Sequence, residues 1–149
     1  MTYHKLLHGA WVFVGDGKKA LFLINEGDAI NPNLRRLSVF ENHDPPSREQ
    51  GSDAPGRAYS SVGGIRSAVE ETDWHELEKE RFAISIAERI NKAALANQFE
   101  EIVIVAPPKI LGDLRREFSK ETGTKIIAEV PKDLTNHTIA DIERLLTSR

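Results

Sequence analysis

The sequence predicts an α/β domain in which helices pack on a mixed five-stranded sheet, in the order βββαβαβα. Three observations predict it. Short β-rich apolar runs separated by turn residues come first in the chain. A continuous apolar run at 102–106, typical of a buried parallel strand, comes later. Stretches with apolar residues three and four positions apart flank that run, and this spacing is helical. Meandering strands followed by helix–strand units favour a mixed sheet.

The first three strands are expected before residue 41. Residues 10–14 and 20–24 are apolar and rich in β-formers, and the Gly-Asp-Gly sequence at 15–17 between them is a turn signal. They are therefore expected to form a hairpin. Residues 34–40 alternate only imperfectly between apolar and polar, which predicts a third strand that is exposed on one face.

Residues 43–72 have a different composition from the rest of the chain. They are rich in proline, glycine and serine and contain few large apolar side chains. Ordering such a segment costs more conformational entropy than its burial recovers. We therefore expect one domain, residues 1–149, with a long flexible loop at about 43–72.

The first long helix is expected at 73–97, with Asp73 as its N-cap and Glu76 completing a capping box. A second helix is expected from the Pro-Pro pair at 107–108 to residue 122, ended by Gly123. A fifth strand at 125–130 and a last helix, capped by Asn136, complete the domain. The apolar stripe of that last helix is Ile139, Ile142 and Leu146.

Composition limits the classes of function. The 149 residues include no cysteine, which excludes disulfides, a thiol nucleophile and thiolate metal sites. No apolar run has the length of a signal peptide or of a membrane span, so the expected location is cytoplasmic, with no membrane partner. A net charge of −3 and a pI of about 6.0 disfavour nucleic-acid binding over a broad surface.

Catalytic signatures are weak. The strand order is that of a ribonuclease H-like domain, whose nucleases need several carboxylates on metal ions. Asp16 follows the first strand, but residues 106–108 after the fourth strand are Ala-Pro-Pro. Asp16 is therefore interpreted as a turn residue, with nuclease as the alternative. No catalytic residue, metal site or cofactor is predicted, because no nucleophile elbow, Walker loop or dinucleotide fingerprint occurs.

Two regions could bind a partner. Gly63 and Gly64 give the long loop backbone freedom, and the flanking Arg57 and Arg66 suit phosphate, although a solvated loop would have the same composition. The pair Trp74-His75 at the expected helix start could line a pocket beside the loop, although packing and capping also explain it.

Several stretches together resemble one family. They are residues 10–20 (AWVFVGDGKKA), the loop after Gly56, residues 73–83 (DWHELEKERFA), residues 102–108 (IVIVAPP) and residues 129–135 (EVPKDLT). The pattern resembles the bacterial host attachment protein family, and the resemblance covers nearly the whole chain. That family is in turn similar to the central domain of archaeal and eukaryotic peptide-chain release factors and of pelota.

This resemblance implies a release-factor central-domain-like fold and a translation-linked role. In that domain a Gly-Gly-Gln loop between the third strand and the first long helix helps hydrolyse peptidyl-tRNA on the ribosome. Gly63 and Gly64 match the two glycines by position, but the third position is Ile65. An isoleucine side chain has no hydrogen-bonding group, so the resemblance does not extend to the catalytic glutamine.

Three hypotheses follow. The favoured one is a non-catalytic factor that binds the ribosome or tRNA through the loop. The alternative is a protein–protein interaction module whose 43–72 loop folds on its partner; the excess of acidic over basic residues in that loop favours it. A hydrolase acting on peptidyl-tRNA or RNA is the third. The sequence predicts no oligomeric state.

Overall fold

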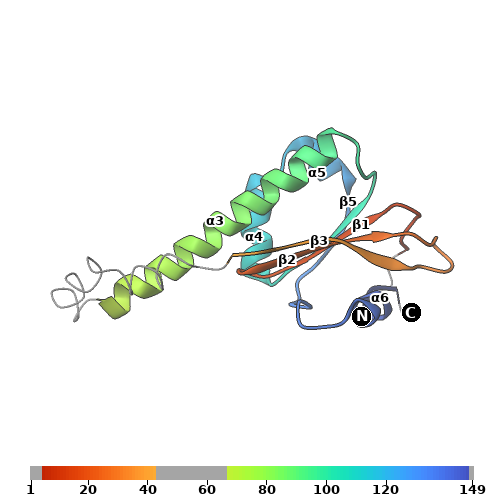
Figure 1. The fold of residues 1–149 in the computed structure, drawn as a ribbon. Coiled ribbons are helices and arrows are strands. Elements are labelled where there is room, and N and C mark those ends of the chain that lie inside the picture. The colour runs from red at the N-terminus through yellow and green to blue at the C-terminus, as the bar shows by residue number, and fades with distance from the viewer. Residues whose placement is uncertain (1–4, 43–66, 148–149) are drawn as a thin grey trace.

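The computed structural model describes residues 5–42 and 67–147, and for residues 67–73 it describes only the backbone (Figure 1). The described elements follow the expected order and confirm the α/β class with a mixed five-stranded sheet. The strands are β1 (Trp11–Gly15), β2 (Lys19–Asn25), β3 (Leu34–Glu41), β4 (Ile102–Val105) and β5 (Ile126–Val130). The helices are α3 (Ser67–Leu95), α4 (Pro108–Glu117), α5 (Lys120–Lys125) and α6 (Ile139–Thr147).

The sheet has the strand order β3-β2-β1-β4-β5. β1, β2 and β3 pair antiparallel, whereas β1 pairs parallel with β4 and β4 with β5. β1 is therefore the central strand, at which the antiparallel half meets the parallel half. Val12 illustrates this position, since it faces Leu23 of β2 on one side and Val103 of β4 on the other.

Alternation along the strands divides the core into two layers. In β1, Phe13 belongs to the layer under α3 and α4, while Val12 and Val14 belong to the layer under α6. β4 divides in the same way, because neighbouring strand residues point to opposite faces. Figure 1 shows α3, α4 and α5 on one side of the sheet and α6 on the other. The continuous apolar run of β4 follows from this burial on both faces.

The expected start of the first long helix is wrong. α3 begins at Ser67, six positions before the expected N-cap Asp73, so Asp73 lies inside the helix. Residues 67–72, which were predicted to lie in the loop, therefore belong to α3. With 29 residues, α3 is about 43 Å long at ~1.5 Å per residue. It crosses the sheet and its N-terminal part continues beyond it (Figure 1).

The helix expected at 108–122 is instead two helices, α4 and α5. Asn91 of α3 explains the break: its Nδ2 donates to the Glu117 carbonyl at 2.9 Å, and its Oδ1 accepts from Ser119 N at 2.9 Å. These bonds satisfy the backbone where α4 ends. Ser119 then caps α5 by accepting from Thr122 N at 3.1 Å. Gly123, expected to end the helix, lies inside α5.

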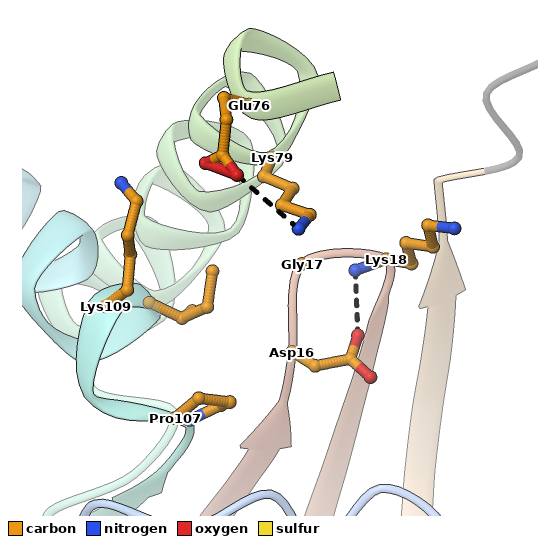
Figure 2. Close-up of a pocket in the computed structure, with 8 residues that line it drawn as sticks. Asp16, Gly17, Lys18, Glu76, Lys79, Pro107 and Lys109 are labelled. Carbon is orange, nitrogen blue, oxygen red and sulfur yellow. Dashed lines mark hydrogen bonds and ion pairs between the residues drawn. The ribbon is translucent and has the colours of Figure 1, made fainter. Parts of the chain in front are cut away.

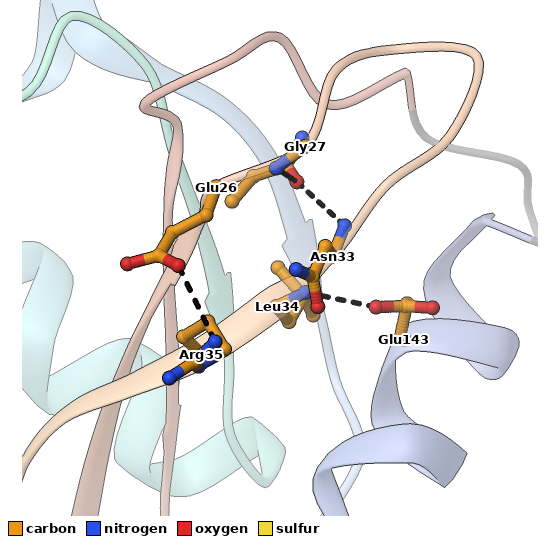
Figure 3. Close-up of polar contacts among 7 residues, drawn as sticks. Glu26, Gly27, Asn33, Leu34, Arg35 and Glu143 are labelled. Carbon is orange, nitrogen blue, oxygen red and sulfur yellow. Dashed lines mark hydrogen bonds and ion pairs between the residues drawn. The ribbon is translucent and has the colours of Figure 1, made fainter.

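The cap of the last helix was also predicted wrongly. Thr138, not Asn136, caps α6: its Oγ1 accepts from Asp141 N at 3.0 Å. α6 is tied to the edge strand β3, because Glu143 Oε1 accepts from the backbone N–H of Leu34 at 2.8 Å (Figure 3). This contact anchors the start of the strand that leads to residue 42.

The turn between β2 and β3 is organised by Asn25, which is fully buried. Its Nδ2 donates to the carbonyl of Leu6 at 2.9 Å, and its Oδ1 accepts from Gly27 N at 3.0 Å and Asn33 N at 2.8 Å. Gly27 has no room for a side chain, since a Cβ would lie 2.1 Å from the Asn31 carbonyl oxygen. The turn is therefore fixed at both ends.

An ion pair joins α4 to β5. Arg115 Nε donates to Glu129 Oε1 at 2.7 Å, and this hydrogen bond, with the charge of Glu129, raises the pKa of Arg115.

No helix among residues 5–42 and 67–147 combines the length and the apolar character that crossing a bilayer requires.

Candidate functional site

The carboxyl ends of the parallel strands meet at one edge of the sheet. β1, β4 and β5 run in the same direction, so residues 16–18, 107–109 and 131–135 follow their ends. In open α/β sheets, ligands bind beyond the carboxyl ends of the strands. This edge is therefore the first place to examine.

Asp16 turns the chain from β1 to β2. Its Oδ1 accepts from the backbone N–H groups of Lys18 and Lys19, both at 2.7 Å, which is an Asx turn. The hydroxyl of Thr135 lies 3.1 Å from Asp16 Oδ2 and 2.6 Å from Asp133 Oδ1. A hydroxyl has one proton, so the two carboxylates share a single donor. Asp16 therefore also links the hairpin to the loop after β5.

A cavity of about 350 Å³ lies between the β1–β2 hairpin, α3 and the start of α4 (Figure 2). Lys79 extends from α3 toward the hairpin, Lys109 extends from the start of α4, and Glu76 lies next to Lys79. Lys79 Nζ is 3.8 Å from Glu76 Oε1. The remaining lining residues are Asp16, Gly17, Lys18, Pro107 and Ile110.

A second cavity, of about 250 Å³, lies at the same end of the sheet, and Gly17, Lys18 and Lys79 line both. His75, Glu78 and Asn42 complete its lining. The Asn42 backbone N–H donates to the Lys18 carbonyl at 2.7 Å, which holds the end of β3 against the hairpin. His75 thus lines this cavity.

Trp74 does not line either cavity. It is half-buried, and the guanidinium of Arg81 lies 6.0 Å from the centre of its ring. This distance is at the outer limit of a cation–π contact. Trp74 and His75 are adjacent in α3, but His75 lines the second cavity whereas Trp74 lies beside Arg81.

The predicted loop residues Arg57, Gly63, Gly64 and Arg66 lie outside the described residues. The described chain stops at Asn42 and resumes at Ser67. Asn42 lines the second cavity, so the described chain stops beside the hairpin and resumes at the start of α3.

Sequence reasoning did not find the lysines of this edge. Lys18, Lys79 and Lys109 lie on three separate elements and become neighbours of one cavity only in the fold. Each stands among ordinary surface residues in the sequence, so no local pattern marks it. The one available signal was the rule that residues after parallel strands share an edge, which applies to Lys18 and Lys109.

The fold and this edge define a class: an α/β domain with a mixed sheet of order 3-2-1-4-5 and a segment inserted between its antiparallel strands and its first helix. The family model for bacterial archaeo-eukaryotic release factor family 12 matches residues 9–146. The chain therefore belongs to this family, and the expected likeness to release factors is confirmed at family level.

A curated relative adds little about activity. The chain is similar to the uncharacterized protein RP470 of Rickettsia prowazekii (strain Madrid E), with 32% identity over 75 residues. The match covers 49% of this chain and 50% of that protein, so it spans about half of each.

Proposed function

We propose that this protein is a non-catalytic, translation-linked factor that associates with the ribosome or with tRNA through segment 43–66. The family match over residues 9–146 carries the proposal. It is supported by the place of the segment, between Asn42 at the hairpin and the start of the long helix α3. In the sequence this segment contains Arg57, Gly63 and Gly64.

The proposal excludes the glutamine-dependent hydrolysis of peptidyl-tRNA. Ile65 stands after the paired glycines, and its side chain neither donates nor accepts a hydrogen bond. A factor that binds without hydrolysing agrees with this sequence. The cytoplasm is the compartment that this function requires. An effect on host attachment, which the first resemblance suggests, would then be indirect and follow from translation.

A protein-interaction module is the second candidate, and the net charge of −3 favours it. An acidic chain is repelled by RNA phosphates except where basic side chains gather locally. In this case segment 43–66 would bind a protein.

The test is co-sedimentation with ribosomes from lysate in a sucrose gradient. The intact chain is compared with a variant in which residues 43–66 are replaced by a Gly/Ser linker of the same length, which leaves α3 whole. A second variant, Gly63→Val with Gly64→Val, asks whether the glycines are needed. Co-migration of the intact chain alone supports the proposal. Absence of the intact chain from every ribosomal fraction contradicts ribosome association.

A further inference from the structure

The cavity between the hairpin and α4 gathers positive charge from separate parts of the chain. Lys79 comes from α3 and Lys109 from the first turn of α4, 30 positions later. Their side chains are 41% and 61% exposed, so each ammonium group can reach a ligand from solvent. Lys18 lies at the rim, and in Figure 2 its side chain extends away from Lys79.

Among the residues that the structure describes, neither lysine is held by a close ion pair. Lys79 Nζ lies 3.8 Å from Glu76 Oε1, and Lys109 Nζ lies 3.8 Å from Asp113 Oδ2. Both distances exceed that of a charge-assisted hydrogen bond, about 2.7–2.9 Å. Asp113 also pairs with Arg116, and therefore neutralises Lys109 only in part. The two ammonium groups therefore keep most of their capacity to bind an anion.

Apart from the carboxylates of Asp16 and Glu76, the rest of the lining suits an anion attached to an apolar group. Pro107 and Ile110 line the cavity with apolar atoms beside the lysines. α4 starts at this cavity with no acidic residue in its first turn, so its dipole adds to the positive potential. A volume of about 350 Å³ holds a phosphate together with its sugar.

We propose that Lys79 and Lys109 form a binding site for a phosphodiester of an RNA strand, with the sugar against Pro107 and Ile110. The phosphate is assigned from the lysines and the cavity, whereas the choice of RNA rests on the proposed function. Without a ligand, Lys79 pairs with Glu76. When phosphate binds, Lys79 leaves Glu76 and pairs with the phosphate. This cavity shares Gly17, Lys18 and Lys79 with the second cavity, which Asn42 lines. RNA held in it would therefore lie close to the last described residue before segment 43–66.

The experiment uses the full-length chain and fluorescently labelled unfractionated tRNA, with binding followed by anisotropy at several salt concentrations. Lys79→Gln with Lys109→Gln is expected to weaken binding about tenfold at low salt. The slope of log affinity against log salt should fall by roughly 0.7–0.9 for each lysine that contacts phosphate. Lys79→Arg should retain binding. Lys92→Gln, on the exposed end of α3, is the matched control and should change nothing.

Glu76→Gln tests the site in the opposite direction. It removes a negative charge next to Lys79, and affinity should rise about threefold to fivefold. A residue with only a structural role would not increase affinity when replaced. Melting temperatures of all variants should agree, because the replaced side chains are 41–61% exposed.

The outcomes separate this inference from the proposed function. tRNA affinity that is unchanged in the double lysine variant overturns the site, even if the intact chain still co-sediments with ribosomes. Lysine-dependent tRNA binding supports the site, even if no co-sedimentation is found. Inorganic pyrophosphate is the competing probe: if it binds in a lysine-dependent manner while tRNA does not bind, the assignment to RNA is wrong.

Discussion

Gly17 at the tip of the first hairpin lies directly against Lys79 of α3. A Cβ added to Gly17 would be 2.7 Å from Cγ and 2.9 Å from Cδ of Lys79. This contact places the lysine at the junction of the two cavities and fixes the spacing between the hairpin and the helix.

Gly17→Ala is expected to destabilise the protein by about 1 kcal/mol or more, because the new methyl overlaps the stem of Lys79. Gly112→Ala is the matched control. Gly112 lies within α4 with no atom within 4 Å of an added Cβ, and alanine should stabilise the helix by about 0.5–1 kcal/mol. Urea denaturation measures both changes. Equal stability changes for the two variants would contradict the contact.

Asn91→Ala is expected to lower stability by about 2 kcal/mol. It removes the bonds to the Glu117 carbonyl, Ser119 N and the Thr122 hydroxyl, and each such bond contributes about 0.5–1.5 kcal/mol. Lys92→Ala, the exposed neighbour in the same helix, should change stability by less than about 0.5 kcal/mol. The midpoint of chemical denaturation is the readout. A loss as small as that of Lys92→Ala would mean that Asn91 does not hold the break.

Thr138→Ala should destabilise the protein by about 1 kcal/mol through loss of the α6 cap. Asn136→Ala should be close to neutral, although the sequence suggested Asn136 as the cap. Thermal unfolding of the two variants compares the two caps directly. A larger loss of stability in Asn136→Ala than in Thr138→Ala would show that Asn136 is the cap, as the sequence predicts.

Glu143→Ala should destabilise the protein by about 1–2 kcal/mol, because it leaves the Leu34 N–H without its charged acceptor. Hydrogen exchange at Leu34 should accelerate in the variant. Arg144→Ala is the control: it removes only an exposed i,i+3 ion pair with Asp141, worth about 0.3–0.5 kcal/mol. Unchanged exchange at Leu34 would show that α6 does not protect β3.

The sheet could be predicted from the sequence because its signals are local. Apolar runs rich in β-formers and the turn residues between them predict β1 and β2, and the continuous apolar run predicts β4. The break between α4 and α5 could not be predicted, since it depends on Asn91, which lies 28 positions before Ser119. Gly123 resembled a helix end only because that distant contact was unknown.

The candidate site shows the same limit. Asp16 was identified as a turn residue from its neighbours, and its Asx turn is a local structure. That Lys79 and Lys109 line one cavity follows instead from how α3 crosses the sheet, which no local pattern encodes. The expected capping box at Asp73 misplaced the start of α3, because a good N-cap sequence can also lie within a longer helix.

Binding of the purified chain to purified ribosomes tests the central claim most directly. The intact protein is compared with a variant whose residues 43–66 are shuffled, which preserves length, composition and charge. We expect saturable binding by the intact chain and at least about tenfold weaker binding by the shuffled one, the loss expected when a few specific contacts are removed. Equal affinity of the two proteins would contradict a role for segment 43–66, and no binding of either would contradict ribosome association.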